Sequence, residues 1–328
     1  TGRSLLMATV PREEMIISKD YAKSCDYSWS EGLTEPLPSG IINIPIEHFY
    51  EFMETCGGTD NEYIIVSQRS DLGLAYQREF PVYADMEKWV KSLPYMDGLM
   101  DLTNLGYRSL EIPPRCDVTK CEITDNYSIK CDSYTWSTIP NVPSNVKKWY
   151  MTNCMTEEPG HLICIPFGIL DDEAADKLVQ TPQLDKKNWL YANFQTYTLE
   201  RFYLKSQLGT RSMSQDWITF VNEAKPIEEY FRDISEHRYV MCPDGNGIDC
   251  FRTWETLYLG SIPIVKRSRV TEQFSDLPIL IVDDLFSVTL EMLEEKYEEI
   301  LLKKDNLDKA KLSYWTKIFK ESKDENCN

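Results

Sequence analysis

Histidine is scarce in this chain, and long apolar runs are missing. The 328 residues include three histidines, His48, His161 and His237, which are scattered, and no pair of Cys-x-x-Cys repeats occurs. Structural and catalytic zinc sites need such ligands at close spacing, so we expect no metal site. No run approaches the ~18 consecutive apolar residues of a membrane span, and we expect no membrane contact within this segment.

Basic residues are also in short supply. The chain has 35 Lys and Arg residues against 53 Asp and Glu residues, which gives a net charge of -18. This excess of negative charge opposes binding to nucleic acid or to an anionic membrane. An anionic ligand would therefore need a local basic pocket. The candidates to line such a pocket are Arg201, Lys205, Arg252, Lys266, Arg267 and Arg269.

Length and alternation predict an α/β protein with two domains. A chain of 328 residues exceeds the size at which one core usually keeps growing. We expect an N-terminal domain over residues 1–170, a linker over 171–187 and a C-terminal domain over 188–328. In the first, strands are expected at 41–46, 63–67 and 161–166, and helices at 47–55 and 85–92. In the second, strands are expected at 188–194, 238–242, 261–265 and 279–282, and helices at 199–208, 227–236, 288–303 and 312–320. Such alternation is typical of parallel sheets covered by helices.

A glycine-rich loop begins the most informative segment of the sequence. Gly245 and Gly247 flank Asn246 and allow backbone conformations and close ligand approach that other residues resist. Asp249 is expected to cap a helix that starts near Cys250. Unpaired amide groups and the positive end of the helix dipole favour a phosphate at such a position.

The helix that follows carries two charged residues of interest. Arg252 lies in its first turn, and Glu255 lies one turn further, where a carboxylate can accept hydrogen bonds from the two neighbouring hydroxyls of a ribose. Gly260 is expected to end the helix. The β-branched run 261–265 is then typical of a strand that is buried on both faces.

This segment resembles the donor-binding signature of exostosin-like glycosyltransferases of family 47. The shared pattern is Pro-x-Gly-x-Gly-x-Asp at 243–249, Arg-x-Trp-Glu at 252–255 and Gly-x-Ile-Pro-Ile-Val at 260–265. Weaker similarities are Ser67-Gln68-Arg69-Ser70-Asp71, Lys148-Trp149-Tyr150-x-x-Asn153, Ile165-Pro166-Phe167-Gly168-Ile169, and Asn193 with Arg201. One position departs from the pattern, because Phe251 stands where relatives often carry histidine.

The resemblance implies two Rossmann-like domains that face a cleft, the arrangement called GT-B. The C-terminal domain would hold a nucleotide-sugar donor linked to UDP or GDP, and the N-terminal domain would hold a glycan or glycoprotein acceptor. The donor is a substrate, so no cofactor is expected. Family members invert the configuration of the sugar, which requires a base on the acceptor side.

The residues expected to carry this chemistry fall into two groups. Asp71 follows a strand of the first domain and is the expected base, and His48 is the reserve candidate. The donor-binding residues are expected to be Arg201, Lys205, Gly245, Asn246, Gly247, Asp249, Arg252 and Glu255. Arg201, Arg252 and the amides near Asn246 and Gly247 would stabilise the departing nucleoside diphosphate without a metal.

Several alternatives stay open at the level of sequence. The chain could be a glycan-binding or scaffold protein that kept the fold and lost turnover, as the departure at Phe251 allows. A nucleotide-dependent epimerase or dehydrogenase is less favoured, because Cys250 occupies the position of the third glycine in that fingerprint. Asp283-Asp284 resembles the metal-binding acid pair of the other major glycosyltransferase fold, but it lacks the Asp-x-Asp spacing.

The cysteines and the first residue of the chain are relevant to the cellular compartment of the protein. Cys121 and Cys131 flank a predicted hairpin, where they would lie opposite each other and form a disulfide in an oxidising setting. The chain begins with Thr1 rather than Met. We therefore expect the Golgi lumen if an upstream anchor was removed, and the cytoplasm otherwise.

Overall fold

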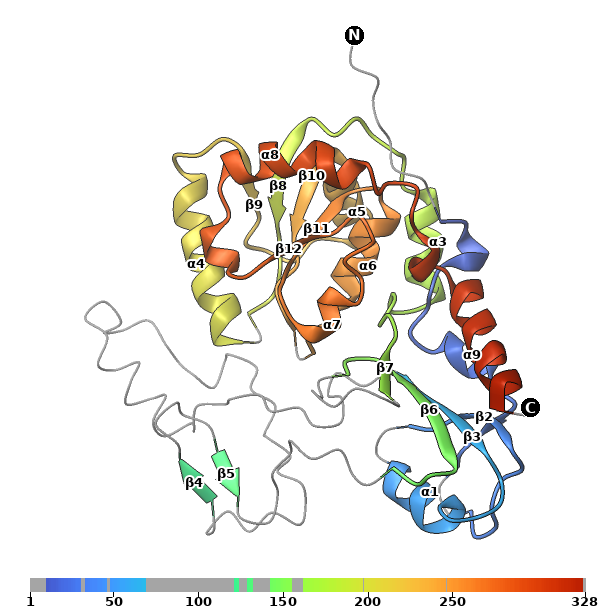
Figure 1. Cartoon of the computed structure of the whole chain (residues 1–328). Helices are drawn as coiled ribbons and strands as arrows, with labels where there is room; N and C mark the ends of the chain where they lie inside the picture. The colour runs from blue at the N-terminus through green and yellow to red at the C-terminus, as the bar shows by residue number, and fades with distance from the viewer. Residues whose placement is uncertain are drawn as a thin grey trace.

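The described part of the chain is an α/β fold. The computed structural model describes residues 10–30, 33–45, 48–68, 121–123, 129–131, 142–154, 162–196, 198–245 and 247–326. Two five-stranded sheets lie in these ranges, and the strands of each sheet run parallel to one another. Figure 1 shows the two sheets as separate bodies of strands with helices packed around them. The α/β prediction is confirmed.

The first sheet uses strands from the N-terminal half in the order β1-β2-β3-β6-β7. The bounds are Tyr27–Ser28 for β1, Gly40–Asn43 for β2, Tyr63–Ser67 for β3, Val146–Met151 for β6 and Leu162–Cys164 for β7. The sequence did not reveal β6, because two lysines interrupt its apolar pattern. The structure explains them: Lys147 reaches Glu62, and Lys148 reaches Glu325 in the C-terminal helix.

The second sheet has the order β12-β11-β10-β8-β9. The bounds are Asn188–Ala192 for β8, Ile218–Phe220 for β9, His237–Met241 for β10, Ile262–Lys266 for β11 and Leu280–Val282 for β12. The chain moves outward from β8 to β9, and it then returns to the other side of β8 to form β10. The neighbouring strands β8 and β10 are therefore the point where the strand order reverses.

Helices fill the connections as the alternation predicted. Their bounds are Phe49–Cys56 for α1, Asp172–Gln180 for α3, Leu199–Ser212 for α4, Ile227–Glu236 for α5, Phe251–Tyr258 for α6, Arg269–Glu272 for α7, Leu290–Leu301 for α8 and Leu312–Asn326 for α9. Gly260 follows α6 with a φ of 69°, which confirms it as the residue that ends that helix. The helix expected at 85–92 lies outside the described residues.

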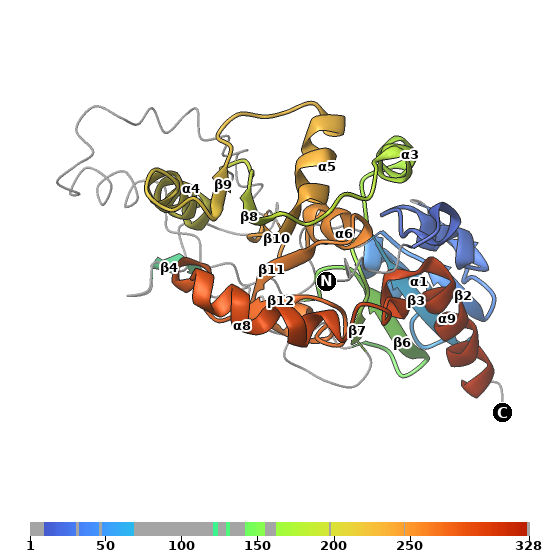
Figure 2. The same cartoon turned by 90° about the horizontal axis from the view of Figure 1, so that it is seen from above.

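The residues expected to form a linker contain a helix. Asp171 accepts a hydrogen bond from the Ala174 amide and so caps α3. The helix is fastened on both sides, since Arg12 pairs with Asp172 and Lys177 pairs with Glu228 of α5. Figure 2 shows α3 between α5 and the N-terminal segment. The linker is thus an ordered part of the described fold.

The C-terminal helix returns to the first sheet. By chain order α9 follows the second sheet, yet it packs against β2 and β3 of the first. The Tyr150 hydroxyl lies 2.6 Å from Ser322 Oγ, and Lys323 donates to Asp26 at 2.8 Å. Figure 1 shows α9 beside β2 and β3, with the C-terminus at the first sheet. The last helix therefore ties the two halves together.

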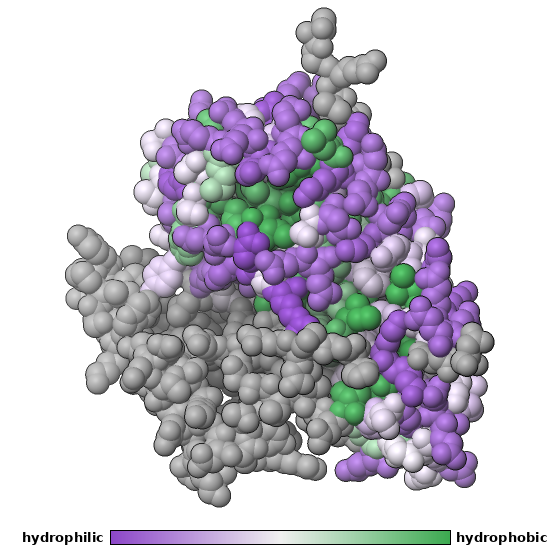
Figure 3. All heavy atoms as spheres, viewed as in Figure 1, coloured by the Kyte–Doolittle hydropathy of each residue, from purple (hydrophilic) through white to green (hydrophobic). Residues whose placement is uncertain are grey.

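One apolar core runs through both halves of the described chain. It joins buried side chains of the first sheet, such as Ile65 and Trp149, to Trp254 and Tyr258 of α6. A second cluster fills the other face of the second sheet, beneath α4 and α8. Figure 3 shows hydrophilic residues over α8 and apolar surface over the strands beside it. None of the described helices is both long and apolar enough to cross a membrane.

A small hairpin stands apart from both sheets. Its strands, β4 (Cys121–Ile123) and β5 (Ile129–Cys131), are antiparallel. The backbone register pairs Cys121 with Cys131, so the prediction that these positions lie opposite each other is confirmed.

Candidate functional site

The candidate site lies where the second sheet reverses its strand order. In open α/β sheets, ligands bind beyond the carboxyl ends of the strands at such a point. The glycine-rich loop follows the carboxyl end of β10, and the segment that leads into α4 follows the carboxyl end of β8. The topology thus brings two chain segments that are 50 residues apart in sequence to one edge of the sheet.

Arg201 of α4 holds the glycine-rich loop in place. Its guanidinium donates to the carbonyls of Asp244 at 2.6 Å, Pro243 at 2.8 Å and Gln195 at 3.1 Å. The side chain is 4% exposed, and burial lowers its pKa. Arg201 therefore serves chiefly to shape the glycine-rich loop. Its guanidinium also places positive charge next to the carbonyls of that loop.

Gly245 is required by this arrangement. Its amide donates to the Gly247 carbonyl at 2.8 Å, which closes the loop tightly. A Cβ atom at position 245 would lie 3.2 Å from Arg201 Nη2, and Arg201 is already held by three carbonyls. Glycine allows the close approach that a side chain would prevent. Asn246, between the two glycines, lies outside the described residues.

Asp249 does not cap the helix, and this expectation was wrong. Cys250 is the N-cap residue of α6, and no side chain among the described residues caps that end. The Asp249 carboxylate instead accepts hydrogen bonds from the Phe167 amide at 2.7 Å and from the Trp254 indole at 2.8 Å. Burial raises the pKa of Asp249 to about 7, although these donors lower it. The start of α6 is thus without a side-chain cap among the described residues.

The loops of the two sheets meet at Asp249. Its amide donates to Asn153 Oδ1 at 2.8 Å, and Asn153 follows β6 of the first sheet. Phe167, which donates to the Asp249 carboxylate, follows β7. A third contact of this kind runs from the Cys164 amide to Gln273 Oε1 at 3.2 Å. Segments that follow the carboxyl ends of β6 and β7 therefore contact segments that follow β10 and β11.

Arg252 and Glu255 project from α6 next to Tyr230 of α5. The Tyr230 hydroxyl donates to Glu255 Oε2 at 3.2 Å, and the Arg252 guanidinium carbon lies 5.8 Å from the centre of the Tyr230 ring. Burial raises the pKa of Glu255, against the opposing effects of Arg252 and the Tyr230 hydrogen bond. Arg252 Nε is buried and has no hydrogen-bond partner among the described residues. This group offers a cation and a carboxylate one turn apart.

Three of the other candidate cations have partners away from the glycine-rich loop. Lys205 donates to the Asn222 carbonyl beyond β9, which places it beside the edge strand rather than at the glycine-rich loop. Lys266, at the end of β11, binds Glu200 at 2.7 Å. Arg267 binds Asp283 at 2.5 Å. Of the six predicted basic residues, Arg201 contacts the glycine-rich loop and Arg252 lies beside Tyr230 at the site.

The acid pair after β12 has local partners. Asp283 accepts from Arg267, and Asp284 accepts from the Phe286 amide at 2.9 Å, where it caps a short helical turn. The pair therefore begins the loop that leads to α8.

Of the two candidates for the catalytic base, His48 lies among the described residues. Asp71 lies outside the described residues. His48 precedes α1, and its Nδ1 lies 3.3 Å from Glu51 Oε2. A carboxylate at Nδ1 fixes the orientation of an imidazole and leaves Nε2 for other contacts.

Phe251, the position that departs from the family pattern, makes an apolar contact. Its ring lies 4.7 Å from the ring of Phe167, between centroids, with 33° between the planes. The aromatic pair packs the start of α6 against the segment after β7.

Sequence reasoning missed two residues. Tyr230 was assigned to a helix, and nothing in the local pattern linked it to Glu255. Lys186 is half-buried and precedes β8, and its amine donates to the carbonyls of Ser235 and Leu259 and to Ser261 Oγ. It caps the last turns of α5 and α6, and burial lowers its pKa to about 7.

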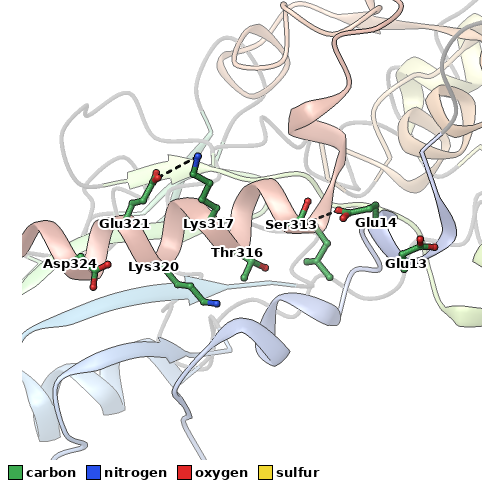
Figure 4. Close-up of a pocket in the computed structure, with 9 residues that line it drawn as sticks. Glu13, Glu14, Ser313, Thr316, Lys317, Lys320, Glu321 and Asp324 are labelled. Atoms are coloured by element: carbon green, nitrogen blue, oxygen red, sulfur yellow. Dashed lines mark hydrogen bonds and ion pairs between the residues drawn. The ribbon is translucent and has the colours of Figure 1, made fainter.

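A cavity of about 510 Å³ lies elsewhere, between α9 and the N-terminal segment. Figure 4 shows that its lining is a mixture of acidic and basic side chains. Glu14 accepts from the Ser313 amide at 3.2 Å, and Lys317 lies 3.6 Å from Glu321. No residue that lines the cavity belongs to the glycine-rich loop or to α6.

No protein-family model matches this chain, and no curated protein matches it.

Proposed function

We propose that the chain is a glycosyltransferase with the GT-B arrangement. It would move a sugar from a UDP- or GDP-linked donor to a glycan or glycoprotein acceptor, with inversion and without a metal. The proposal combines the exostosin-like motif with one observation: the glycine-rich loop, the uncapped start of α6 and Arg252 converge where the second sheet reverses its strand order.

The donor would be bound by its diphosphate and its ribose. Among the described residues no side chain caps the start of α6, and the positive end of that helix favours a phosphate group. Arg252 adds positive charge within the same turn, and Glu255 offers a carboxylate for the ribose hydroxyls. Stabilising the departing diphosphate by amides and arginine needs no metal.

The acceptor would lie on the first sheet. The contacts of Asn153, Phe167 and Cys164 with the second half support an arrangement in which the carboxyl ends of both sheets border the same space. The return of α9 to the first sheet supports a fixed pairing of the two halves. Asp71 would remove the acceptor proton, with His48 as the second candidate.

A second function remains open because of one contact. Phe251 packs on Phe167 at the position where relatives often carry histidine. If that imidazole is needed for turnover, this chain would bind a nucleotide sugar or a glycan without transferring the sugar. Slow release of nucleoside diphosphate in the presence of a bound donor would favour this scaffold function.

The first experiment is a thermal-shift screen with a panel of UDP- and GDP-linked sugars. A ligand that binds only the folded protein at ~100 times its Kd stabilises it by about 2.7 kcal/mol. Nucleoside diphosphate release is then measured for each donor that raises the melting temperature. If no nucleotide or nucleotide sugar raises it, the proposed function is wrong.

A matched pair of variants tests the site. Glu255→Ala should weaken UDP or GDP binding by ~1.5–3 kcal/mol in calorimetry, because a charged acceptor is lost. Glu299→Ala, an exposed acid on α8, removes the same charge at a distance and should leave affinity unchanged. Equal affinities for the two variants would remove Glu255 from the site.

A further inference from the structure

Tyr230 and Glu255 form a contact that the motif does not contain. The two residues belong to neighbouring helices, α5 and α6, and the Tyr230 hydroxyl donates to Glu255 Oε2 at 3.2 Å. The Tyr230 ring also lies 6.3 Å from the ring of Tyr191 in β8, between centroids. Packing from β8 and the cation of Arg252 thus fix where the Tyr230 hydroxyl points.

Because of this contact, the two oxygens of the Glu255 carboxylate have different hydrogen-bond partners. Oε2 receives the tyrosine hydroxyl, and none of the described residues donates to Oε1. A carboxylate oxygen has two lone-pair sites, so Oε1 alone can accept two hydroxyl protons. The group is therefore arranged to receive two neighbouring hydroxyls from one side.

We propose that Tyr230 is a positioning residue for the ribose of the nucleotide: by occupying Oε2 it orients Glu255 so that Oε1 accepts the 2′- and 3′-hydroxyls. The inference rests on the proposed function, since it concerns the same donor site. It adds a residue from outside the sequence motif, and it predicts that the site prefers ribonucleotides to 2′-deoxyribonucleotides.

The contact also predicts how binding depends on pH. Burial raises the pKa of Glu255, whereas Arg252 and the Tyr230 hydrogen bond lower it. Removing the hydroxyl would raise this pKa further, and a protonated acid is a poorer acceptor for the ribose.

The other titratable groups around Glu255 stay neutral or paired. Burial raises the pKa values of the Tyr230 hydroxyl and of the Cys242 and Cys250 thiols. Tyr191 donates to Asp233, which also binds Lys225. His237, which stacks on Tyr191 at 5.1 Å between centroids, has its pKa lowered by burial, so Glu255 is the carboxyl group whose pKa the Tyr230 hydroxyl affects directly.

The test compares Tyr230→Phe with wild type by calorimetry, with UDP, GDP and 2′-deoxy-UDP as probes, from about pH 8 to about pH 5. At neutral pH the variant should bind the ribonucleotide about three- to tenfold more weakly, which corresponds to one hydrogen bond. Its affinity should then fall at a higher pH than that of wild type. For 2′-deoxy-UDP the two proteins should differ less.

Two further variants separate positioning from structural damage. Glu255→Gln cannot ionise, so adding Tyr230→Phe to it should produce no further pH dependence. Tyr314→Phe, on the distant α9, is the control for loss of a tyrosine hydroxyl and should bind as wild type does.

Three outcomes would overturn the inference. One is an unchanged pH profile in Tyr230→Phe, and another is an equal loss of affinity for the ribo- and deoxyribonucleotide. If wild type binds no nucleotide at any pH, the proposed function fails together with the inference. Nucleotide binding with an unaltered Tyr230→Phe profile removes only the role of Tyr230.

Discussion

The Asp249 amide donates a hydrogen bond to Asn153 Oδ1 at 2.8 Å, across the boundary between the two sheets. Asn153 reaches this position with a φ of 54°, in the left-handed region, where asparagine is better tolerated than most residues. Both residues are buried. The backbone turn after β6 and the loop after β10 are therefore coupled by one side chain.

Two substitutions at position 153 should separate the hydrogen bond from the backbone turn. Asn153→Gly keeps the turn and leaves the Asp249 amide unpaired, which should lower the free energy of unfolding by ~1–3 kcal/mol. Asn153→Ala also has to adopt the positive φ, so it should be less stable than the glycine variant by roughly 1 kcal/mol. Urea unfolding measures both, and an alanine variant as stable as the glycine variant would show that the turn relaxes.

Gly245→Ala should disturb the glycine-rich loop. The new Cβ would lie 3.2 Å from Arg201 Nη2, and the three carbonyls that hold Arg201 prevent it from moving away. Overpacking of this kind costs ~1–3 kcal/mol of stability. We expect a lower melting temperature together with weaker nucleotide binding. A variant with unchanged affinity would show that the loop does not contact the diphosphate.

The stability of the protein should depend on pH through Asp249. The pKa of its carboxyl group is about 7 in the folded state, above its usual value of 3.8, so the folded state keeps a proton that the unfolded state has lost. This contribution to stability is complete below about pH 4 and is lost as the pH rises through 7. Asp249→Asn cannot lose that proton. The variant should therefore gain stability relative to wild type between about pH 4 and pH 7, by a few kcal/mol in order of magnitude.

Urea unfolding of both proteins at several pH values measures this difference. If the free energy of unfolding changes with pH in the same way for wild type and Asp249→Asn, the folded and unfolded states release this proton at the same pH.

Transfer should survive chelation of divalent metals. The two acids that most resemble a metal-binding pair already have partners, since Asp283 binds Arg267 and Asp284 accepts from the Phe286 amide. Release of nucleoside diphosphate is measured before and after EDTA. Activity that disappears with EDTA and returns with manganese would contradict the role of Arg252 and the α6 amides in stabilising the leaving group.

The base should be identified by two isosteric substitutions. Asp71→Asn keeps the side-chain shape without its basicity, so turnover should fall by ~10²–10⁴-fold while donor affinity is retained. His48→Gln is the comparison, because His48 has Glu51 at its Nδ1 and is the second candidate. Near-normal turnover of the asparagine variant, with a loss in His48→Gln, would assign the proton transfer to His48.

Local features of the sequence predicted most elements of the second sheet. α5 was predicted at 227–236 and forms over Ile227–Glu236, and α6 ends before Gly260 as expected. These features succeed because helix periodicity, glycine conformations and β-branched runs act within a few residues. The first half was harder: β6 was missed because its two lysines are compensated by Glu62 and Glu325, which are distant in sequence.

The sequence by itself determined the glycine-rich loop, the charged turn of α6 and the alternation of strands and helices. Only the tertiary structure decided what these residues contact. Asp249 pairs with Phe167 and Asn153 instead of capping α6, and Glu255 pairs with Tyr230. The strand order that puts β8 beside β10 and the return of α9 to the first sheet are likewise long-range results. Burial explains the difference, because a buried polar group must find a partner wherever packing brings one, irrespective of its distance along the chain.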